Sequence, residues 1–212
     1  MDLHRFYAWA GRPFRHRRLR DLNALMPSFK TAHILDVGGT LSFWRTMPVR
    51  PSSLSIINSD PTIEEAPMNA GQREGSPPTV LRGDGCALPF EDSSFDIVFS
   101  NSVIEHVGSW ERQVAFAQEC RRVGRKLWVQ TPAYTFPFEP HLLAIGLHWL
   151  PSNIRWLSPR AWLEKWGNQE INHFINEVRL LKFHEMEKLF PNCVIKKETF
   201  LGLTKSYIAY HT

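Results

Sequence analysis

The sequence predicts an α/β protein built on a mostly parallel sheet, with a pair of antiparallel strands at its C-terminal end. Short apolar runs alternate with helical or polar segments over much of the chain, as they do in parallel α/β sheets. The runs end at small or polar residues, which is typical of strands buried on both faces. The expected parallel strands are His33–Val37, Ser53–Ile57, Thr79–Arg82, Phe95–Ser100 and Lys126–Gln130.

Two further patterns complete the predicted fold. Helical spacing of apolar residues from Val107 to Ala117 indicates an amphipathic helix that packs on the sheet. A second helix is expected over Glu185–Phe190. The runs Val194–Phe200 and Lys205–Tyr210 flank a glycine-containing connection, Leu201–Thr204, and therefore predict the antiparallel pair.

Residues 1–30 are predicted to be a basic helical segment, followed by a single domain over residues 31–212. The arginines of this segment are Arg5, Arg12, Arg15, Arg17, Arg18 and Arg20. Such a cluster attracts phosphates, anionic lipid or nucleic acid, and a solvated helix face explains it equally well. We expect peripheral association with an anionic surface as one role. The overall formal charge of +4 argues against specific nucleic-acid binding.

Length and composition fit one folded domain. A chain of 212 residues, 43% hydrophobic and 22% charged, is long enough for one sizeable core. The cysteines are three in number and far apart, which argues against a disulfide framework or a thiolate zinc site. A secretory signal is not recognised, and apolar stretches fall short of the ~20 residues that span a bilayer. We expect a cytoplasmic chain without a transmembrane segment.

The stretch ILDVGGTLSFW, from Ile34 to Trp44, has the pattern of a strand that ends in a ligand-binding loop. In open α/β sheets, ligands bind beyond the carboxyl ends of the strands. Gly38 and Gly39 let a ligand approach the backbone, and Asp36 favours a cationic group over a phosphate. The third glycine of the dinucleotide-binding pattern is absent. A tight turn with a solvated aspartate is the alternative.

This loop and three downstream motifs resemble the type 11 family of class I S-adenosylmethionine-dependent methyltransferases. The loop is similar to the family's acid, apolar residue and G-x-G-x-G pattern, with Thr40 and Ser42 in place of the later glycines. The downstream motifs are GDGCALPF (Gly83–Phe90), SFDIV (Ser94–Val98) and VIEHV (Val103–Val107). Later segments, EPH at Glu139–His141 and FLGLTKS at Phe200–Ser206, resemble small methyltransferases that accompany bacterial glycan and cell-surface polysaccharide synthesis.

The resemblance implies a Rossmann-like fold and S-adenosylmethionine as the cofactor. Asp36 would bind the methionine ammonium, directly or through water. Gly38 and Gly39 would pass their backbone beneath the cofactor. Asp84 would meet the adenine amino group, and Gly85 would leave room for the ring.

The resemblance also assigns residues to the ribose and to the sulfonium end. An acid directly after the second strand usually takes the ribose hydroxyls, and Asn58 holds that place here. Asp60 lies two residues further on, so both residues are candidates. Asn101 and Ser102, just past the fourth strand, would close the pocket around the sulfonium.

The acceptor side is expected to come from an insertion at about residues 132–175, which is rich in proline and aromatic residues. His106 is a candidate general base for an acceptor hydroxyl, although it could equally pack against or cap the following helix. Glu139 and His141 are candidates for acceptor binding, with burial as the alternative. His141 and His148 would be ~10 Å apart along a helix, so we expect no metal site.

These observations predict methyl transfer from S-adenosylmethionine to oxygen on a sugar or another small polar acceptor. The alternative is a noncatalytic binding protein that keeps the fold but has a weakened cofactor pocket, as the substitutions Thr40 and Ser42 suggest. A nicotinamide oxidoreductase is a more distant third, because the dinucleotide glycine pattern is missing.

Overall fold

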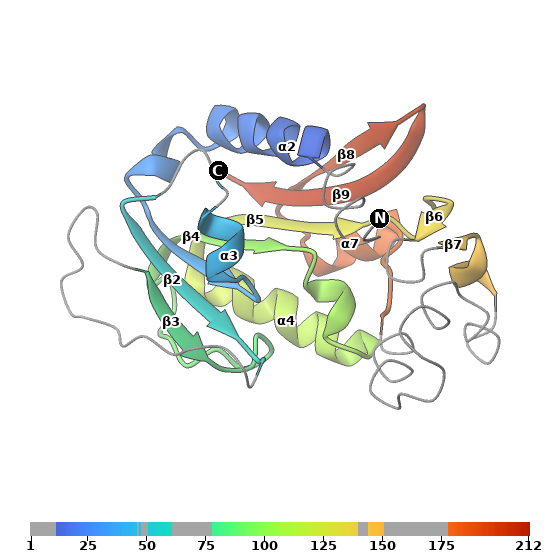
Figure 1. The fold of residues 1–212 in the computed structure, drawn as a ribbon. Helices are drawn as coiled ribbons and strands as arrows, with labels where there is room; N and C mark the ends of the chain where they lie inside the picture. The colour runs from blue at the N-terminus through green and yellow to red at the C-terminus, as the bar shows by residue number, and fades with distance from the viewer. Residues whose placement is uncertain (1–11, 46, 48–50, 61–77, 140–143, 151–177) are drawn as a thin grey trace.

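A seven-stranded sheet forms the centre of the protein (Figure 1), here seen in a computed structural model that describes residues 12–45, 47, 51–60, 78–139, 144–150 and 178–212. The strand order is β3-β2-β1-β4-β5-β9-β8. The strands are β1 (His33–Val37), β2 (Ser53–Asn58), β3 (Thr79–Arg82), β4 (Phe95–Asn101), β5 (Gly124–Pro132), β8 (Val194–Phe200) and β9 (Leu203–His211). The first five run parallel, and β9 is antiparallel to both β5 and β8. The predicted fold class is therefore confirmed.

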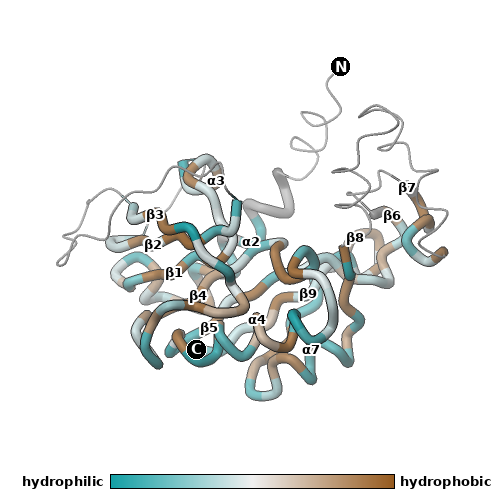
Figure 2. Tube along the Cα trace, turned by 90° about the horizontal axis from the view of Figure 1, so that it is seen from below, coloured by the Kyte–Doolittle hydropathy of each residue, from teal (hydrophilic) through white to brown (hydrophobic). Residues whose placement is uncertain are grey.

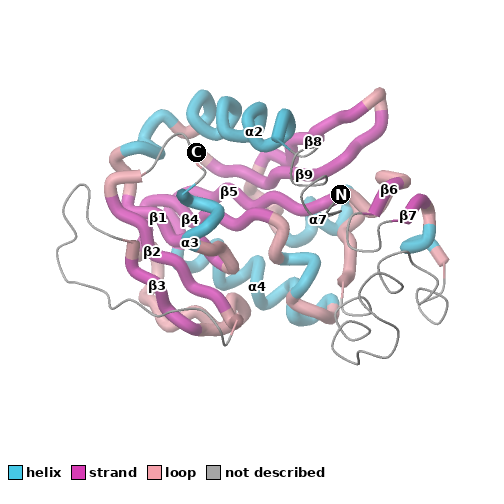
Figure 3. Tube along the Cα trace, viewed as in Figure 1, coloured by secondary structure: helices cyan, strands magenta, loops and turns pink. Residues whose placement is uncertain are grey.

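Helices cover both faces of the sheet, as Figure 3 shows. One face carries α4 (Trp110–Val123) and α7 (Phe183–Leu189), and the other carries α2 (Arg12–Leu25), a 3-10 turn η1 (Pro27–Lys30) and α3 (Leu41–Arg45). Alternate residues of β1 serve the two cores, because successive side chains of a strand point to opposite faces. Leu35 packs in the hydrophobic core between the sheet and α4, whereas Ile34 packs in the core between the sheet and α2.

Element boundaries differ from the predicted ones where side chains cap the backbone. The helix expected from Val107 begins at Trp110, because the Ser109 hydroxyl accepts the N–H of Arg112. The preceding residues, Ile104–His106, form the short 3-10 turn η2. The last helix begins at Phe183 rather than at Glu185, whose carboxylate accepts the backbone N–H of Lys182 at 2.7 Å.

β8 has the predicted bounds, β9 is longer than predicted, and the connection between them is tighter. The predicted loop Leu201–Thr204 is in fact a turn at Leu201 and Gly202, which have φ values of +49° and +79°. These left-handed values match those of a tight hairpin turn, so pairing resumes at once between Phe200 and Leu203.

The two segments that flank the sheet are described only in part. The predicted basic helical segment appears as α2 and η1, and residues 1–11 lie outside the described residues. Of the expected insertion, β6 (Phe138–Glu139) pairs with β7 (Ala144–Ile145), and η3 (Leu147–Trp149) follows. Within the described part of the chain, helices long and apolar enough to cross a bilayer are not found.

Candidate functional site

A cavity of about 430 Å³ lies at the carboxyl edge of the sheet, beside the point where the strand order reverses. Its walls come from the ends of β1, β2 and β3 and from the segment between β4 and α4. The lining residues are Val37, Gly38, Ile57, Asn58, Ser59, Gly83, Asp84, Gly85, Val103, His106, Val107 and Arg112. The volume falls within the range of roughly 300–1,000 Å³ that small-molecule and cofactor sites occupy.

The glycine loop forms the floor of this cavity for steric reasons. Gly38 has φ +81°, and a Cβ there would collide with the side chain of Val103. A Cβ on Gly39 would collide with the carboxylate of Asp36, which lies directly behind it. Thr40 directly precedes α3 and caps it, because its hydroxyl accepts the N–H of Phe43 at 3.3 Å. The residue that departs from the family's glycine pattern therefore has a capping role of its own.

Asp36 is buried behind the loop and is not among the residues that line the cavity. Its Oδ2 accepts a hydrogen bond from the Trp44 indole N–H at 2.6 Å, and its Oδ1 is buried without a hydrogen-bond partner. Burial raises the pKa of this carboxyl to about 7, against the opposing effect of the Trp44 bond. A nearby cation would restore the ionised form, so the environment suits the ammonium group that the sequence predicted.

Asn58 holds the loop in place. Its Nδ2 donates to the carbonyl oxygens of Gly38 at 3.2 Å and Gly39 at 2.8 Å, and its Oδ1 accepts the N–H of Asp60 at 3.0 Å. Asp60 is exposed and does not line the cavity, whereas Asn58 does. An aspartate at position 58 would offer no N–H donor to the two carbonyl groups. The asparagine in place of the usual acid is thus explained by its contacts.

Replacing Asn58 by Asp should weaken S-adenosylhomocysteine binding about tenfold or more, because two partly buried carbonyl groups lose their donor and face a carboxylate. Asp60→Asn should change the affinity far less, since it keeps the backbone bond to Asn58. Calorimetric titration of both folded variants makes the comparison. Equal affinities for wild type and Asn58→Asp would show that the loop does not depend on these bonds.

The far wall of the cavity is built around Asp84 and Arg112. The Arg112 guanidinium donates to both carboxylate oxygens of Asp84, at 3.1 and 3.0 Å, and to the carbonyl of Val107 at 2.7 Å. The backbone N–H of Cys86 also donates to Asp84, at 2.9 Å. Partial burial raises the pKa of Asp84, but these donors outweigh it and hold the pKa below its ordinary value. An ionised Asp84 can still accept a further donor, such as an amino group.

Asn101 and Ser102 lie apart from this cavity, at the adjacent ends of β4 and β5. The Ser102 hydroxyl donates to Oε1 of Gln130 at 3.0 Å, and the same oxygen accepts from Arg18 at 2.9 Å. Arg18 also donates to Oδ1 of Asn101. The guanidinium thus links both strand ends to α2.

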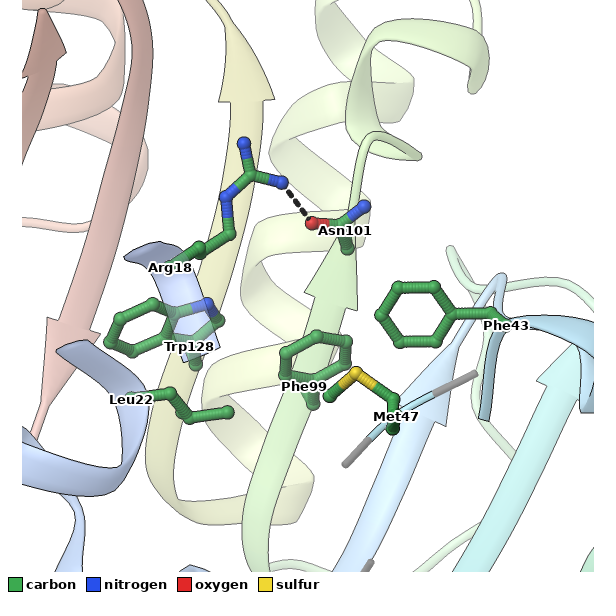
Figure 4. Close-up of a pocket in the computed structure, with 7 residues that line it drawn as sticks. All are labelled: Arg18, Leu22, Phe43, Met47, Phe99, Asn101 and Trp128. Atoms are coloured by element: carbon green, nitrogen blue, oxygen red, sulfur yellow. Dashed lines mark hydrogen bonds between the residues drawn. The ribbon is translucent and has the colours of Figure 1, made fainter. Parts of the chain in front are cut away.

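The Arg18–Asn101 bond closes one end of a second, water-sized cavity of about 10 Å³ (Figure 4). The rest of its wall is largely apolar: Leu22, Phe43, Met47, Phe99 and Trp128. In Figure 4, the Asn101 amide nitrogen is turned away from Arg18. Because Arg18 donates to the oxygen, this bond fixes the orientation of the Asn101 amide.

Of the three predicted catalytic residues, the structure describes the side chain of His106 but not those of Glu139 and His141. His106 lines the 430 Å³ cavity at the end of η2. Glu139 belongs to β6, and its side chain lies outside what the structure describes; His141 lies outside the described residues altogether. His148 is buried, with Nε2 at 3.0 Å from the carbonyl oxygen of Tyr134. Of these candidates, the described residues bring only His106 to the cavity.

Three polar residues of this region were not predicted. Arg112 lies in the first turn of α4, and its position within an amphipathic helix gave no signal of a site. Arg18 was one of many clustered arginines in the sequence, and nothing distinguished it from its neighbours. Gln130 was recognised only as the end of a strand. These residues act through partners distant in the chain, which sequence spacing does not reveal.

The described residues fit S-adenosylmethionine. A buried, unpartnered carboxylate oxygen lies behind a loop whose glycines admit no side chain, and an ionised aspartate lines the opposite wall. These features match the cation, the close backbone contact and the amino group of that cofactor. Dinucleotides would place phosphates near Asp36, which has no counter-ion among its hydrogen-bond partners.

Comparisons with known proteins agree with the fold. Residues 35–127 match the family described as "Methyltransferase domain". A protein of Mycobacterium marinum described as an uncharacterized methyltransferase is 31% identical over 120 residues, which are 55% of this chain. The match covers 45% of that relative, so the chain aligns with less than half of its length.

Solved structures show the same fold at low sequence identity. An S-adenosylmethionine-dependent methyltransferase from Mesorhizobium loti has a TM-score of 0.54 at 13% identity, covering 90% of this chain and 95% of the other. A complex of the Haloferax volcanii Trm112 methyltransferase activator and a putative methyltransferase gives 0.53 at 12% identity, covering 97% and 94%. The family match over residues 35–127, the sheet order and the cavity all agree with a methyltransferase domain that uses S-adenosylmethionine.

Proposed function

We propose that this protein transfers a methyl group from S-adenosylmethionine to an oxygen atom of a sugar or another small polar acceptor. The observation that carries the cofactor assignment is the cavity itself, with glycine backbone on its floor and Asp84 on its wall. The resemblance of residues 131–212 to glycan-modifying methyltransferases supports the acceptor class.

Individual residues of the chain would have separate roles in this reaction. The cofactor, when bound, supplies a methyl group on a sulfonium, which is already a good leaving group. Asp36 would balance the ammonium, and Asp84 would accept a hydrogen bond from the adenine amino group. His106, on the cavity wall, would accept the proton of the acceptor hydroxyl as the new carbon–oxygen bond forms. Positioning supplies much of the rate enhancement in such a displacement.

The acceptor would be held beyond the cofactor, by residues that follow β5. Glu139 and His141 are our candidates, because a carboxylate and an imidazole beside aromatic residues suit the hydroxyls and apolar face of a sugar ring. The basic N-terminal segment would add peripheral association with an anionic surface, through arginines other than Arg18, which is already paired.

Calorimetric titration with S-adenosylhomocysteine beside NAD tests the cofactor assignment. We expect saturable binding of S-adenosylhomocysteine and no binding of NAD, because the loop lacks the third glycine of the dinucleotide-binding pattern and Asp36 lies where the phosphates would be. Binding of NAD alone would overturn the proposal. If neither ligand bound, the noncatalytic alternative would replace it.

A further inference from the structure

The turn of the β8–β9 hairpin carries three exposed apolar side chains, Phe200, Leu201 and Leu203, which we call the apolar tip. Their exposed fractions are 44%, 85% and 49%. Figure 1 shows the hairpin extending beyond the rest of the sheet, on the side where β6 and β7 lie. Single exposed apolar residues are ordinary on protein surfaces, but a group of them at a projecting turn points to a binding surface.

The conformation of Leu201 is unfavourable for the fold. Its φ of +49° is left-handed, a region that favours Asn or Gly in hairpin turns and is strained for a bulky L-residue. Its side chain is the most exposed of the large hydrophobic residues in the described part of the chain, so packing does not offset this cost. Folding therefore does not account for leucine at this position.

Other apolar side chains lie on the same side of the molecule as the tip. The rings of Phe136 and Phe200 are 6.5 Å apart, between centroids. On the neighbouring β6–β7 unit, Ile145 is 79% exposed, and Trp149 and Leu150 are each 47% exposed. Figure 2 shows hydrophobic colouring on β7 and on parts of the β8–β9 hairpin, on the same side of the molecule.

The charges around the tip are mostly positive. Residues 194–211 contain the lysines Lys196, Lys197 and Lys205 and one acid, Glu198. Glu198 is buried and paired with Arg18, and Lys196 pairs with Asp21, so these charges are locally balanced. The ammonium of Lys197 lies 4.1 Å from the ring centroid of Phe183. Lys197 and Lys205 each lie four residues from Leu201, or roughly 13 Å along a strand.

We propose that the apolar tip inserts into the interface of a membrane with an anionic surface. Interfacial segments bury apolar side chains roughly 5–10 Å deep, which would leave Lys197 and Lys205 near the level of the lipid head groups. A fluid bilayer accepts a projecting tip without a matching pocket. A second copy of this chain would instead bring the same lysines together and repel.

Sedimentation of the full chain with lipid vesicles tests this proposal. Vesicles of phosphatidylcholine containing roughly one third phosphatidylglycerol should bind the protein, and pure phosphatidylcholine should bind it much less. The double variant Leu201→Asn/Leu203→Thr should bind about tenfold more weakly or worse. It keeps the fold, because Asn suits the left-handed turn and Thr suits a strand. Lys197→Gln/Lys205→Gln should lose about fivefold per lysine, and the preference for phosphatidylglycerol with it.

Val194→Thr is the matched control, because Val194 is 57% exposed at the opposite end of β8 and should not affect vesicle binding. Thermal melting checks that each variant is folded. Failure of the wild type to sediment with anionic vesicles would overturn the proposal, and so would equal binding by the tip variant. Light scattering that showed a wild-type dimer dissociated by the tip variant would assign the surface to a second copy instead.

Discussion

Replacing Arg18 with methionine is expected to lower the free energy of unfolding by about 3–5 kcal/mol, the usual cost of leaving a buried charge without its partner. The Arg18 and Glu198 side chains are 11% and 6% exposed. Arg18 donates to both Glu198 oxygens, at 3.1 and 2.8 Å. Methionine retains most of the apolar stem, so the loss reports mainly on the charge. Chemical denaturation measures it.

The exposed pair Arg125–Asp96 provides the control. Its side chains are 65% and 47% exposed, so Arg125→Met should cost no more than about 1 kcal/mol. Glu198→Gln should rescue part of the Arg18→Met loss, because it removes the stranded charge. If Arg18→Met cost no more than Arg125→Met, the pair would not stabilise the fold.

In the Arg18→Met variant, the contribution of Glu198 to the pH dependence of stability should have the opposite sign from that in the wild type. Burial raises the pKa of Glu198, but Arg18 and the Ser206 hydroxyl outweigh it and hold the pKa below its ordinary value. In the wild type, the stability that Glu198 contributes is therefore present above its unfolded pKa and is lost as the pH falls through the folded pKa. Without Arg18, burial dominates, and the contribution should instead decline as the pH rises.

Asp36→Asn is expected to weaken S-adenosylhomocysteine binding ten- to hundredfold while stabilising the free protein at alkaline pH. The loss of a charge-assisted bond to the ammonium accounts for the affinity, at roughly 1.5–3 kcal/mol. The gain in stability follows from burial, since the variant no longer has to ionise a carboxyl group behind the loop. Calorimetry and denaturation measure the two effects on the same preparations.

The sign of the pH dependence follows from the raised pKa of Asp36, about 7 against an ordinary 3.8. Below pH 3.8 the carboxyl group is protonated in both the folded and the unfolded protein, so it does not oppose folding. Above about pH 7 it must be ionised while buried, and the full cost lowers the stability. A difference of that size corresponds to about 4 kcal/mol. Asp36→Asn should therefore become more stable relative to the wild type as the pH rises over this window.

Asp96→Asn is the matched control for this pH series. Asp96 lies near the amino end of β4, far along the strand from the site, and its side chain is 47% exposed. It should alter neither the pH dependence nor the cofactor affinity by a comparable amount. Parallel stability curves for wild type and Asp36→Asn from pH 4 to pH 8 would contradict a raised pKa at Asp36.

The elements of the fold were predictable because each has a local pattern. The strands were found from short apolar runs, and α4 was found from apolar residues at helical spacing. The exact ends of the helices and strands were less predictable. They depend on local backbone conformation, such as the capping of α4 by Ser109 and the left-handed turn at Leu201, and this leaves no periodic pattern in the sequence. The glycine loop and Asp84 could be placed at the sheet edge because parallel strands bring their carboxyl ends together.

The contacts that organise the site were beyond sequence reasoning. Asn58 was expected as a ribose candidate, but its amide is engaged by two backbone carbonyls of the glycine loop. Asp36 accepts a hydrogen bond from the indole of Trp44, which α3 places behind the loop. Neither relation leaves a spacing rule in the chain, because both are set by how the loop folds over the sheet.

The Arg18–Glu198 pair also has a consequence for the order of events during synthesis. Its partners are 180 residues apart, so at roughly 5–20 residues per second α2 leaves the ribosome about 10–40 seconds before β8. The residues that line the cofactor cavity all lie between Val37 and Arg112, and the strands that carry them emerge earlier. A nascent chain can therefore begin to build its cofactor site while Arg18 still lacks its partner. The last strands to emerge bury that charge and join the two ends of the chain.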